Sequence, residues 1–181
     1  MSSVRGQLLI AGPSLLDPNF WRTVVLIVEH TDEGALGLVL NRPSEASVRE
    51  AVPQLRDIVD LDEHLFIGGP VQPSAVIVLA QFEDPGDAAL LSFDDVGVLG
   101  TGISLDETIA GVRRGRAFVG HSGWGPGQLD SELERGDWIL EPARREDAFS
   151  SGPGELWSEV LTRKGGSYAL VARMPADPSV N

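Results

Sequence analysis

The sequence predicts a single α+β domain. Its 181 residues, 42% of them hydrophobic, are enough for one domain with a sizeable core. Strand-like and helix-like segments follow one another without the regular alternation of a doubly wound sheet, which favours the α+β class. We find no internal repeat, low-complexity segment or linker. We therefore expect residues 1–173 to form one domain and residues 174–181 to form a flexible C-terminal tail.

The N-terminal part predicts three strands. Leu8–Ala11 is a short apolar run that Gly12-Pro13 stops. Thr23–Val28 is rich in β-branched residues and apolar on both faces, so it should lie in the middle of a sheet. Leu36–Leu40 follows after a turn, and these two segments should pair as a hairpin.

The middle of the chain predicts a short helix followed by more strands. Ser47 and Glu50 have the spacing of a capping box, so a helix should begin near Val48. Pro53 should interrupt that helix or restart it. Four further apolar segments predict strands: Leu65–Ile67, Ala75–Phe82, Leu90–Phe93 and Val96–Leu99.

Three more helices are predicted in the C-terminal half. A second capping box, Ser104–Glu107, opens a segment with apolar residues at helical spacing. Its C-terminal end would carry the cations that a helix dipole favours there: Arg113, Arg114 and Arg116. Asp130–Arg135 predicts another helix, and Pro153 opens the last one. The last helix should turn four side chains inward: Leu156, Trp157, Val160 and Leu161.

Three strands complete this half: Arg116–Gly120, Asp137–Leu140 and an edge strand at Tyr168–Ala172. The glycine-rich stretch Gly120–Leu129 lies between the first of these and the helix at Asp130. Glycine adopts backbone angles that a Cβ forbids, so we interpret this stretch as a shaped strand-to-helix turn.

Composition and charge exclude several classes of function. The net charge of −13 repels phosphate backbones, so we expect no direct contact with nucleic acid. The chain has no cysteine, which excludes disulfides, thiolate nucleophiles and cysteine-ligated zinc. Its apolar runs are too short for a signal peptide or a membrane span. We therefore expect a cytoplasmic protein with no membrane partner.

His121 and Ser122 suggest a hydrolase. However, the nucleophile elbow needs Gly-x-Ser-x-Gly, and here Trp124 occupies the last position. In that fold the partner histidine also follows the serine, whereas the three histidines of this chain, His30, His64 and His121, all precede it. A triad in another chain order stays open, with Ser122 served by one of these three rings.

Metal and phosphate sites find little support. The polar run Glu29–Glu33 is better explained as a solvated turn, and no metal-ligand spacing is present. The chain has neither a P-loop nor a complete dinucleotide fingerprint. Gly125-Pro126-Gly127 precedes a helix and could offer N–H groups to an anion, but a tight packing turn is the favoured interpretation. We predict no metal and no cofactor.

Several blocks carry a family resemblance, in order along the chain: Asp17–Phe20, Thr23–Leu26, Glu29-His30, Gly34–Pro43, Gly68–Val71, and Gly123–Leu129 followed by Glu132-Leu133 and Trp138. Together they resemble the bacterial AlgH/YqgE family over roughly Gly6 to Leu170. The resemblance implies an α+β fold with a bifurcated sheet, a small barrel-like part and surrounding helices. It also implies a cytoplasmic protein with no established enzymatic activity.

The chain departs from the family pattern in places. Gly120-His121-Ser122 stands where the family usually has Gly-Tyr-Ala, and Ala80 stands where a histidine is often found. The segment Gly111–Arg116 is shortened. Any family chemistry that used the usual tyrosine or histidine therefore does not transfer, and the His121-Ser122 pair is a local variant.

The leading functional hypothesis is a non-enzymatic protein that binds an unidentified small molecule or protein, with no catalytic residue. Three polar or glycine-rich loops carry the family blocks, and we expect them to lie close together as a shared surface. The candidate residues are Asn41, Arg42, Pro43, Gly68, Gly69, Pro70, Gly123, Trp124, Gly125 and Gln128. The alternatives are a hydrolase that uses Ser122 with a histidine, and a transcriptional regulator. The AlgH name reflects a regulatory association with alginate production, and any such role here would be indirect.

Overall fold

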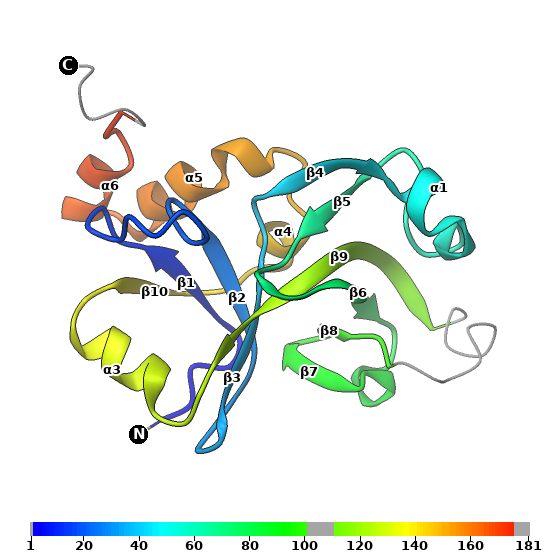
Figure 1. Ribbon diagram of the computed structural model, residues 1–181, viewed down its shortest axis with the longest axis horizontal. Helices are drawn as coiled ribbons and strands as arrows, with labels where there is room; N and C mark the ends of the chain where they lie inside the picture. Colours follow the sequence, from blue (N-terminus) through cyan, green and yellow to red (C-terminus); the bar gives the residue numbers. More distant parts are fainter. Residues whose placement is uncertain (1, 101–110, 176–181) are drawn as a thin grey trace.

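The computed structural model describes residues 2–100 and 111–175 and has the predicted α+β architecture (Figure 1). The strands are β1 (Gln7–Ala11), β2 (Val24–Thr31), β3 (Gly34–Val39), β4 (Pro43–Ser47), β5 (His64–Ile67), β6 (Val71–Phe82), β7 (Leu90–Phe93), β8 (Val96–Val98), β9 (Val112–Trp124) and β10 (Trp138–Pro142). The helices are α1 (Val48–Ala51), α3 (Gln128–Glu134), α4 (Arg145–Ala148), α5 (Leu156–Lys164) and α6 (Ser167–Val171).

The strands form one sheet that forks at β9. The main path runs β10-β1-β2-β3-β9-β6-β8-β7, and every pair along it is antiparallel. Near its C-terminal end β9 pairs with β3, with Gly37 opposite Ser122, whereas further back it pairs in parallel with β5, with Phe66 opposite Phe118. β5 pairs in turn with β4, so a two-stranded ribbon branches from the sheet (Figure 1). The bifurcated sheet is therefore confirmed.

The other branch of the sheet curls back towards β2. The hydroxyl of Ser92 on β7 donates to the carbonyl of Ile27 on β2 at 2.8 Å. No backbone ladder joins β7 to β2 in the described part of the chain. The strands from β2 to β7 are therefore barrel-like without forming a closed barrel.

β2 is the central strand that its sequence predicts. Residues 24–28 are all fully buried, and alternate side chains enter two different cores. Val24 and Leu26 pack in the core beneath α5, whereas Val25 and Ile27 pack in the core beneath α3. Because both faces of the sheet are covered here, apolar residues are needed at consecutive positions.

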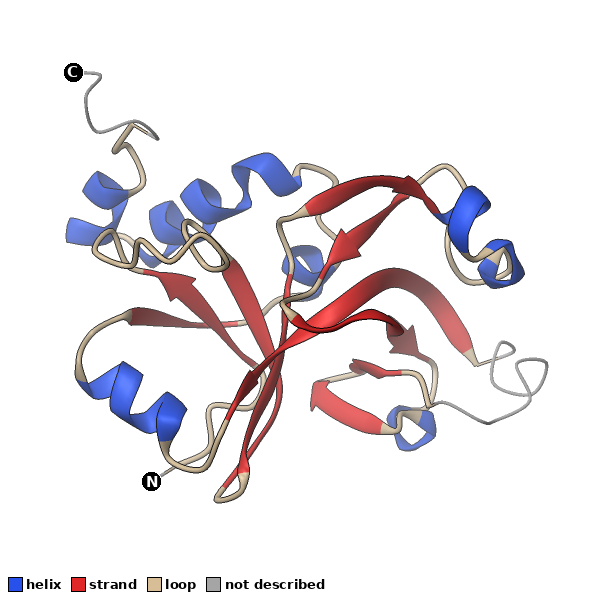
Figure 2. Ribbon diagram, in the orientation of Figure 1, coloured by secondary structure: helices blue, strands red, loops and turns tan. Residues whose placement is uncertain are grey.

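Helices lie around the margins of the strands (Figure 2). All four predicted inward side chains of α5 are buried, from Leu156 to Leu161. Gly136 follows α3 with φ +78°, a conformation that suits glycine at a helix end. At the start of α1, Ser47 accepts a hydrogen bond from the backbone N–H of Glu50, as the capping box predicts. No helix within residues 2–100 and 111–175 is long and apolar enough to cross a membrane.

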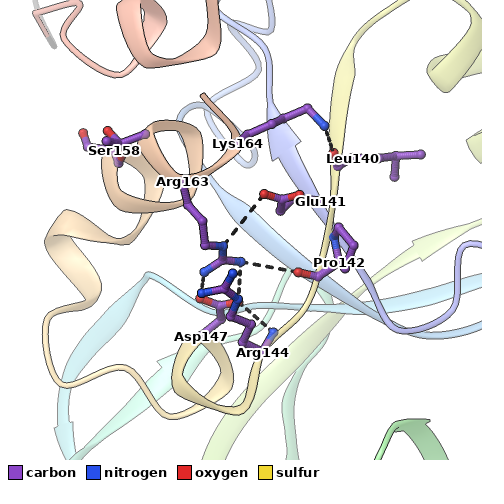
Figure 3. Close-up of polar contacts among 9 residues, drawn as sticks. Leu140, Glu141, Pro142, Arg144, Asp147, Ser158, Arg163 and Lys164 are labelled. Atoms are coloured by element: carbon purple, nitrogen blue, oxygen red, sulfur yellow. Dashed lines mark hydrogen bonds and ion pairs between the residues drawn. The ribbon is translucent and has the colours of Figure 1, made fainter. Parts of the chain in front are cut away.

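A polar network ties α4 and α5 to β10 (Figure 3). Arg163 on α5 donates to both carboxylate oxygens of Asp147 on α4, at 2.8 and 2.9 Å. The same carboxylate accepts from the backbone N–H of Arg144 at 2.8 Å. The Asp147 side chain is only 4% exposed, so these bonds replace the water it has lost. Lys164 donates to the Leu140 carbonyl of β10 at 2.7 Å, which fixes the end of α5 against the sheet.

Two predicted elements are wrong. Val112–Trp124 is one strand, so Arg113, Arg114 and Arg116 do not end a helix. Cross-strand pairing with β6 decides this, because Arg114 donates to Gln81 directly opposite it, at 3.0 Å. Residues 168–172 form α6 and its C-cap rather than an edge strand, since a short apolar run fits either state and this one packs against α5. The helix predicted from Ser104 and residues 176–181 of the tail lie outside the described residues.

Two glycine-containing segments cross at the fork. Gly69 follows β5 with φ +153°, and Gly120 lies within β9 with φ +72°. A Cβ on Gly120 would lie 2.4 Å from the Gly69 carbonyl oxygen, and a Cβ on Gly69 would lie 2.3 Å from the His121 carbonyl carbon. The two backbones therefore touch. The stretch from Gly120 is not a turn throughout, because β9 continues to Trp124 and only residues 125–127 form the turn into α3.

We predict that Gly120→Ala lowers the free energy of unfolding by about 2–5 kcal/mol, because it adds left-handed strain to overpacking against backbone. Gly154→Ala is the matched control, since a Cβ there meets nothing within 4 Å. Chemical denaturation of both variants measures the difference. A loss below about 1 kcal/mol for Gly120→Ala would show that the crossing is not tightly packed.

Candidate functional site

Two of the three predicted loops are in direct contact. The backbone N–H of Ile67 donates to the Arg42 carbonyl at 2.8 Å. The Gly68 carbonyl accepts hydrogen bonds from the Val39 N–H at 2.9 Å and from the Ser122 hydroxyl at 3.1 Å. The loop at residues 68–70 therefore reaches β9 one residue before the third predicted loop, residues 123–128. That the three loops form one binding surface stays a prediction.

Asn41 and Arg42 hold neighbouring backbone in place. The Asn41 amide accepts from the Val24 N–H at 3.0 Å and donates to the Arg22 carbonyl at 2.9 Å. The Arg42 guanidinium donates to the carbonyls of Asn19 and Trp21, at 2.6 and 3.1 Å. Partial burial lowers the pKa of Arg42, and the nearby Asp17 carboxylate partly offsets this effect. The observed contacts of both side chains are therefore structural, because they hold backbone segments of this chain in place.

Trp124 belongs to a buried aromatic cluster rather than to an open pocket wall. It is 6% exposed, and its ring lies 6.3 Å from that of Phe20 and 6.2 Å from that of Trp138. One oxygen of Glu132 accepts from both indole N–H groups, at 3.3 Å from Trp124 and 3.0 Å from Trp138. Gln128 closes the adjacent turn by accepting from the Gly125 N–H at 3.0 Å. Of the ten candidate residues, only Pro43, Pro70, Gly123, Gly125 and Gln128 are exposed.

The geometry argues against Ser122 as a nucleophile. Ser122 has no exposed surface, and its hydroxyl donates to the Gly68 carbonyl. None of the three imidazoles hydrogen-bonds to it. The ring of His121 leaves the strand on the opposite face, with its Nδ1 buried and unpaired, and burial lowers the pKa of this histidine. A hydrolase needs a base within reach of an accessible hydroxyl, and neither condition is met.

The other two histidines have structural partners. His30 Nδ1 accepts from the Val4 N–H at 3.0 Å, and its Nε2 lies 3.4 Å from the Asp130 carboxylate. His64 Nδ1 lies 2.7 Å from the Ser44 carbonyl. Within the described ranges, no three histidine, aspartate or glutamate side chains are grouped closely enough to hold a metal ion.

A groove of about 560 Å³ opens next to Pro43, where the β4–β5 ribbon faces the segment after α4. We call it the Arg116 groove. Its lining residues are Pro43, Glu63, His64, Phe66, Arg116, Phe149, Ser150, Ser151 and Pro153. Two phenylalanines and two prolines supply apolar walls, and the other five lining residues are polar or charged. Small-molecule sites of similar size also combine apolar walls with polar groups.

Arg116 is the unusual member of this groove. Its side chain is 7% exposed, although it carries a full charge. One terminal nitrogen donates to Glu63 at 2.6 Å and the other donates to the Ser150 carbonyl at 2.8 Å. The guanidinium carbon lies 4.5 Å from the centre of the Phe66 ring. Its Nε is buried and has no hydrogen-bond partner, which costs about 1–3 kcal/mol unless an acceptor is supplied.

This groove was not predicted from the sequence, because Arg116 was expected to end a helix and to begin the strand that follows it. The alternation of side chains along the strand could have predicted that Arg116 is buried. Arg116 and Phe118 point to the same face of β9, and Phe118 is fully buried, so Arg116 must be buried as well. Phe149 and Ser150 follow α4, which has no sequence signal of comparable strength.

A second hollow, of about 290 Å³, lies beside Trp21 and Trp157. It is lined by Gly12, Pro13, Leu16, Trp21, Arg22, Trp157, Met174 and Pro175. Arg22 has φ +53°, and its guanidinium carbon lies 4.4 Å from the Trp157 ring centre and 5.3 Å from that of Trp21. It also donates to the Met174 carbonyl. The Arg22 guanidinium already interacts with two aromatic rings and a backbone carbonyl of this chain. This hollow is therefore the weaker candidate for a ligand site.

The sequence of this chain is similar to those of known bacterial proteins. A profile of the AlgH-like family matches residues 8–169, which is most of the chain. The chain belongs to the AlgH-like family. Among its relatives, a UPF0301 protein of Thermobifida fusca is 42% identical over 192 residues, with 99% of this chain and 96% of the relative covered. A UPF0301 protein of Streptomyces coelicolor is 40% identical, with 100% and 97% covered.

Solved structures agree with the AlgH-like fold. A crystal structure of a Corynebacterium diphtheriae protein superposes with a TM-score of 0.85 at 29% identity, covering 95% of this chain and 93% of that one. The solution structure of the AlgH protein from Pseudomonas aeruginosa gives 0.70 at 30% identity, covering 98% of both chains. The forked sheet of this AlgH-like chain is therefore shared with proteins that differ at most positions.

The shared carboxylate of Glu132 yields a stability prediction. Glu132→Ala should lower the free energy of unfolding by about 1–3 kcal/mol, because two largely buried indole N–H groups lose their acceptor. Glu134→Ala, at an exposed position of the same helix, is the control and should change stability by less than about 0.5 kcal/mol. Denaturation followed by tryptophan fluorescence compares them, and equal losses would contradict the role given to Glu132.

Proposed function

We propose that this AlgH-like chain is a non-enzymatic binding protein whose ligand occupies the Arg116 groove. One observation carries the proposal: a buried, charged side chain, Arg116, lines a groove that two phenylalanines and two prolines also line. Apolar walls with convergent polar groups are typical of small-molecule sites.

The shape of the groove supports the same proposal. Its volume of about 560 Å³ lies within the range of small-molecule sites. Phe66, Phe149 and two prolines supply apolar walls, and the other lining residues supply polar groups that can orient a ligand: Glu63, His64, Arg116, Ser150 and Ser151. The buried, hydrogen-bonded state of Ser122 supports a binding role over a hydrolytic one.

We place the protein in the cytoplasm. A regulatory role would be indirect and would act through a bound small molecule or protein, because a net charge of −13 opposes contact with DNA phosphates. Pro43 belongs both to the groove and to the predicted loop surface, so a partner on that surface would lie beside the ligand.

A fragment titration followed by ¹H–¹⁵N NMR tests the proposal. Small aromatic compounds should shift the amide signals of His64, Phe66 and Ser151 together. Ser151→Trp fills part of the groove and should weaken the binding of these fragments at least about tenfold, since a bulky side chain occupies the ligand volume.

Ser131→Trp is the control, because Ser131 is exposed on α3 and does not line the groove. It should leave affinity within about twofold of the unchanged protein. Binding that persists in Ser151→Trp, or shifts that gather around Trp21 and Trp157 instead, would overturn the assignment of the groove.

A further inference from the structure

We infer that the second hollow, of about 290 Å³, binds a small organic acid. The carboxylate of this ligand accepts a hydrogen bond from Arg22, and its apolar body lies against Leu16 and Trp21. We call this site the Arg22 hollow. It is separate from the Arg116 groove and takes a different class of ligand, so the inference stands or falls independently of the function proposed for that groove.

The charged end of Arg22 lies in the wall of the hollow. Its guanidinium carbon is 4.4 Å from the ring centre of Trp157 and 5.3 Å from that of Trp21. One terminal nitrogen, Nη2, donates to the Met174 carbonyl. All three of these neighbours line the hollow. The guanidinium itself, and not only the aliphatic stem of Arg22, therefore borders the space that a ligand would fill.

Arg22 keeps donors available for a ligand. A guanidinium has five N–H donors and no acceptor. Aromatic rings pack against its flat face, so they do not use the N–H groups at its edge. Within residues 2–100 and 111–175, Nε and Nη1 of Arg22 have no hydrogen-bond partner, and neither atom is fully buried. Water reaches these donors, and a ligand oxygen can replace that water.

The local charge of the hollow favours an anion. Arg22 is the one charged side chain among the described lining residues, and the others are glycine, proline, leucine, tryptophan and methionine. A cationic ligand would meet a like charge, whereas an anion meets an opposite charge and no lining carboxylate. The net charge of −13 repels anions at long range. A monocarboxylate therefore fits better than a phosphate monoester, which carries nearly two charges.

Large apolar side chains are exposed around this cation. Leu16 is 73% exposed, Trp21 38% and Met174 47%. They are three of the six large hydrophobic side chains that are exposed within the described ranges, and all three line the same hollow. Exposed apolar side chains that gather at one place indicate a binding site. The apolar body of a ligand would remove their surface from water.

Asn41 fixes the backbone that carries the cation. Arg22 has φ +53°, a left-handed conformation that residues with a Cβ rarely adopt. The Asn41 amide donates to the Arg22 carbonyl at 2.9 Å and accepts from the Val24 N–H at 3.0 Å, which holds this conformation. The guanidinium is therefore positioned before a ligand arrives, which lowers the entropic cost of binding.

Hexanoate and its neutral analogue 1-hexanol are the probes. Their dissociation constants are measured by NMR titration of the full chain at neutral pH. Both should shift the amide signals of Trp21 and Arg22 and the indole signal of Trp157. Hexanoate should bind at least about threefold more tightly than 1-hexanol, because only hexanoate gains a charged hydrogen bond with Arg22.

Arg22→Gln removes the charge and should weaken hexanoate at least about fivefold, while 1-hexanol stays within about twofold. Arg5→Gln is the matched control, since Arg5 is exposed and does not line the hollow. The neighbouring Gly6 N–H bonds to the Ile27 carbonyl, further along β2, so this charge lies away from Arg22. Hexanoate affinity should change less than about twofold in this control.

A pair of variants at Leu16 gives a second measurement that does not depend on Arg22→Gln being folded. Leu16 is exposed, so neither Leu16→Glu nor Leu16→Gln disturbs the core. The two new side chains have nearly the same size, and they differ in charge. Leu16→Glu should bind hexanoate at least about threefold more weakly than Leu16→Gln does, while the two variants should bind 1-hexanol equally.

The outcomes separate this inference from the function proposed for the groove. Equal affinities for hexanoate and 1-hexanol, with no difference between the two Leu16 variants, would overturn the selection of an acid. Hexanoate that shifts only groove signals such as those of His64 and Phe66, or shifts no signal, would overturn the Arg22 hollow as a site. Neither result affects the binding of neutral aromatic fragments to the groove, which is measured separately.

Discussion

The crossing of Gly69 over Gly120 is the constraint on which the rest of the fold depends. Backbone touches backbone there, because a Cβ on either glycine would lie within 2.4 Å of the other strand. This contact brings β5 alongside β9 in parallel. β3 pairs with a later part of β9, at residues 122–124. The forked sheet is thus a consequence of two residues without side chains, and the Ser122 hydroxyl reinforces it from within.

The Arg116 groove depends on that fork. Phe66 lies three residues before Gly69, and Arg116 lies four residues before Gly120, so the crossing fixes the two side chains relative to each other. The far wall comes from Phe149, which follows α4 and is held by the buried pair of Asp147 with Arg163 (Figure 3). A groove with one wall from the sheet and one from a helix-bearing segment combines a rigid donor with room for a ligand.

Local patterns in the sequence predict much of the fold and little of the groove. Five consecutive apolar residues from Val24 place β2 in the centre, and the spacing of Leu156 with Val160 identifies the buried face of α5. Arg116 was expected at the junction of a helix and a strand, because the run of arginines before it resembles a helix end. Pairing with β6 instead makes the whole run part of one strand. Phe149 reaches the groove through contacts far apart in the sequence, which no local spacing encodes.

The central claim is that the Arg116 groove binds a small aromatic ligand. A crystal structure determined with a saturating aromatic fragment tests this most directly. We predict the ring of the fragment in the groove, against Phe66 and Phe149. A fragment found only in the hollow lined by Trp21 and Trp157, or an empty groove at saturation, would contradict the account.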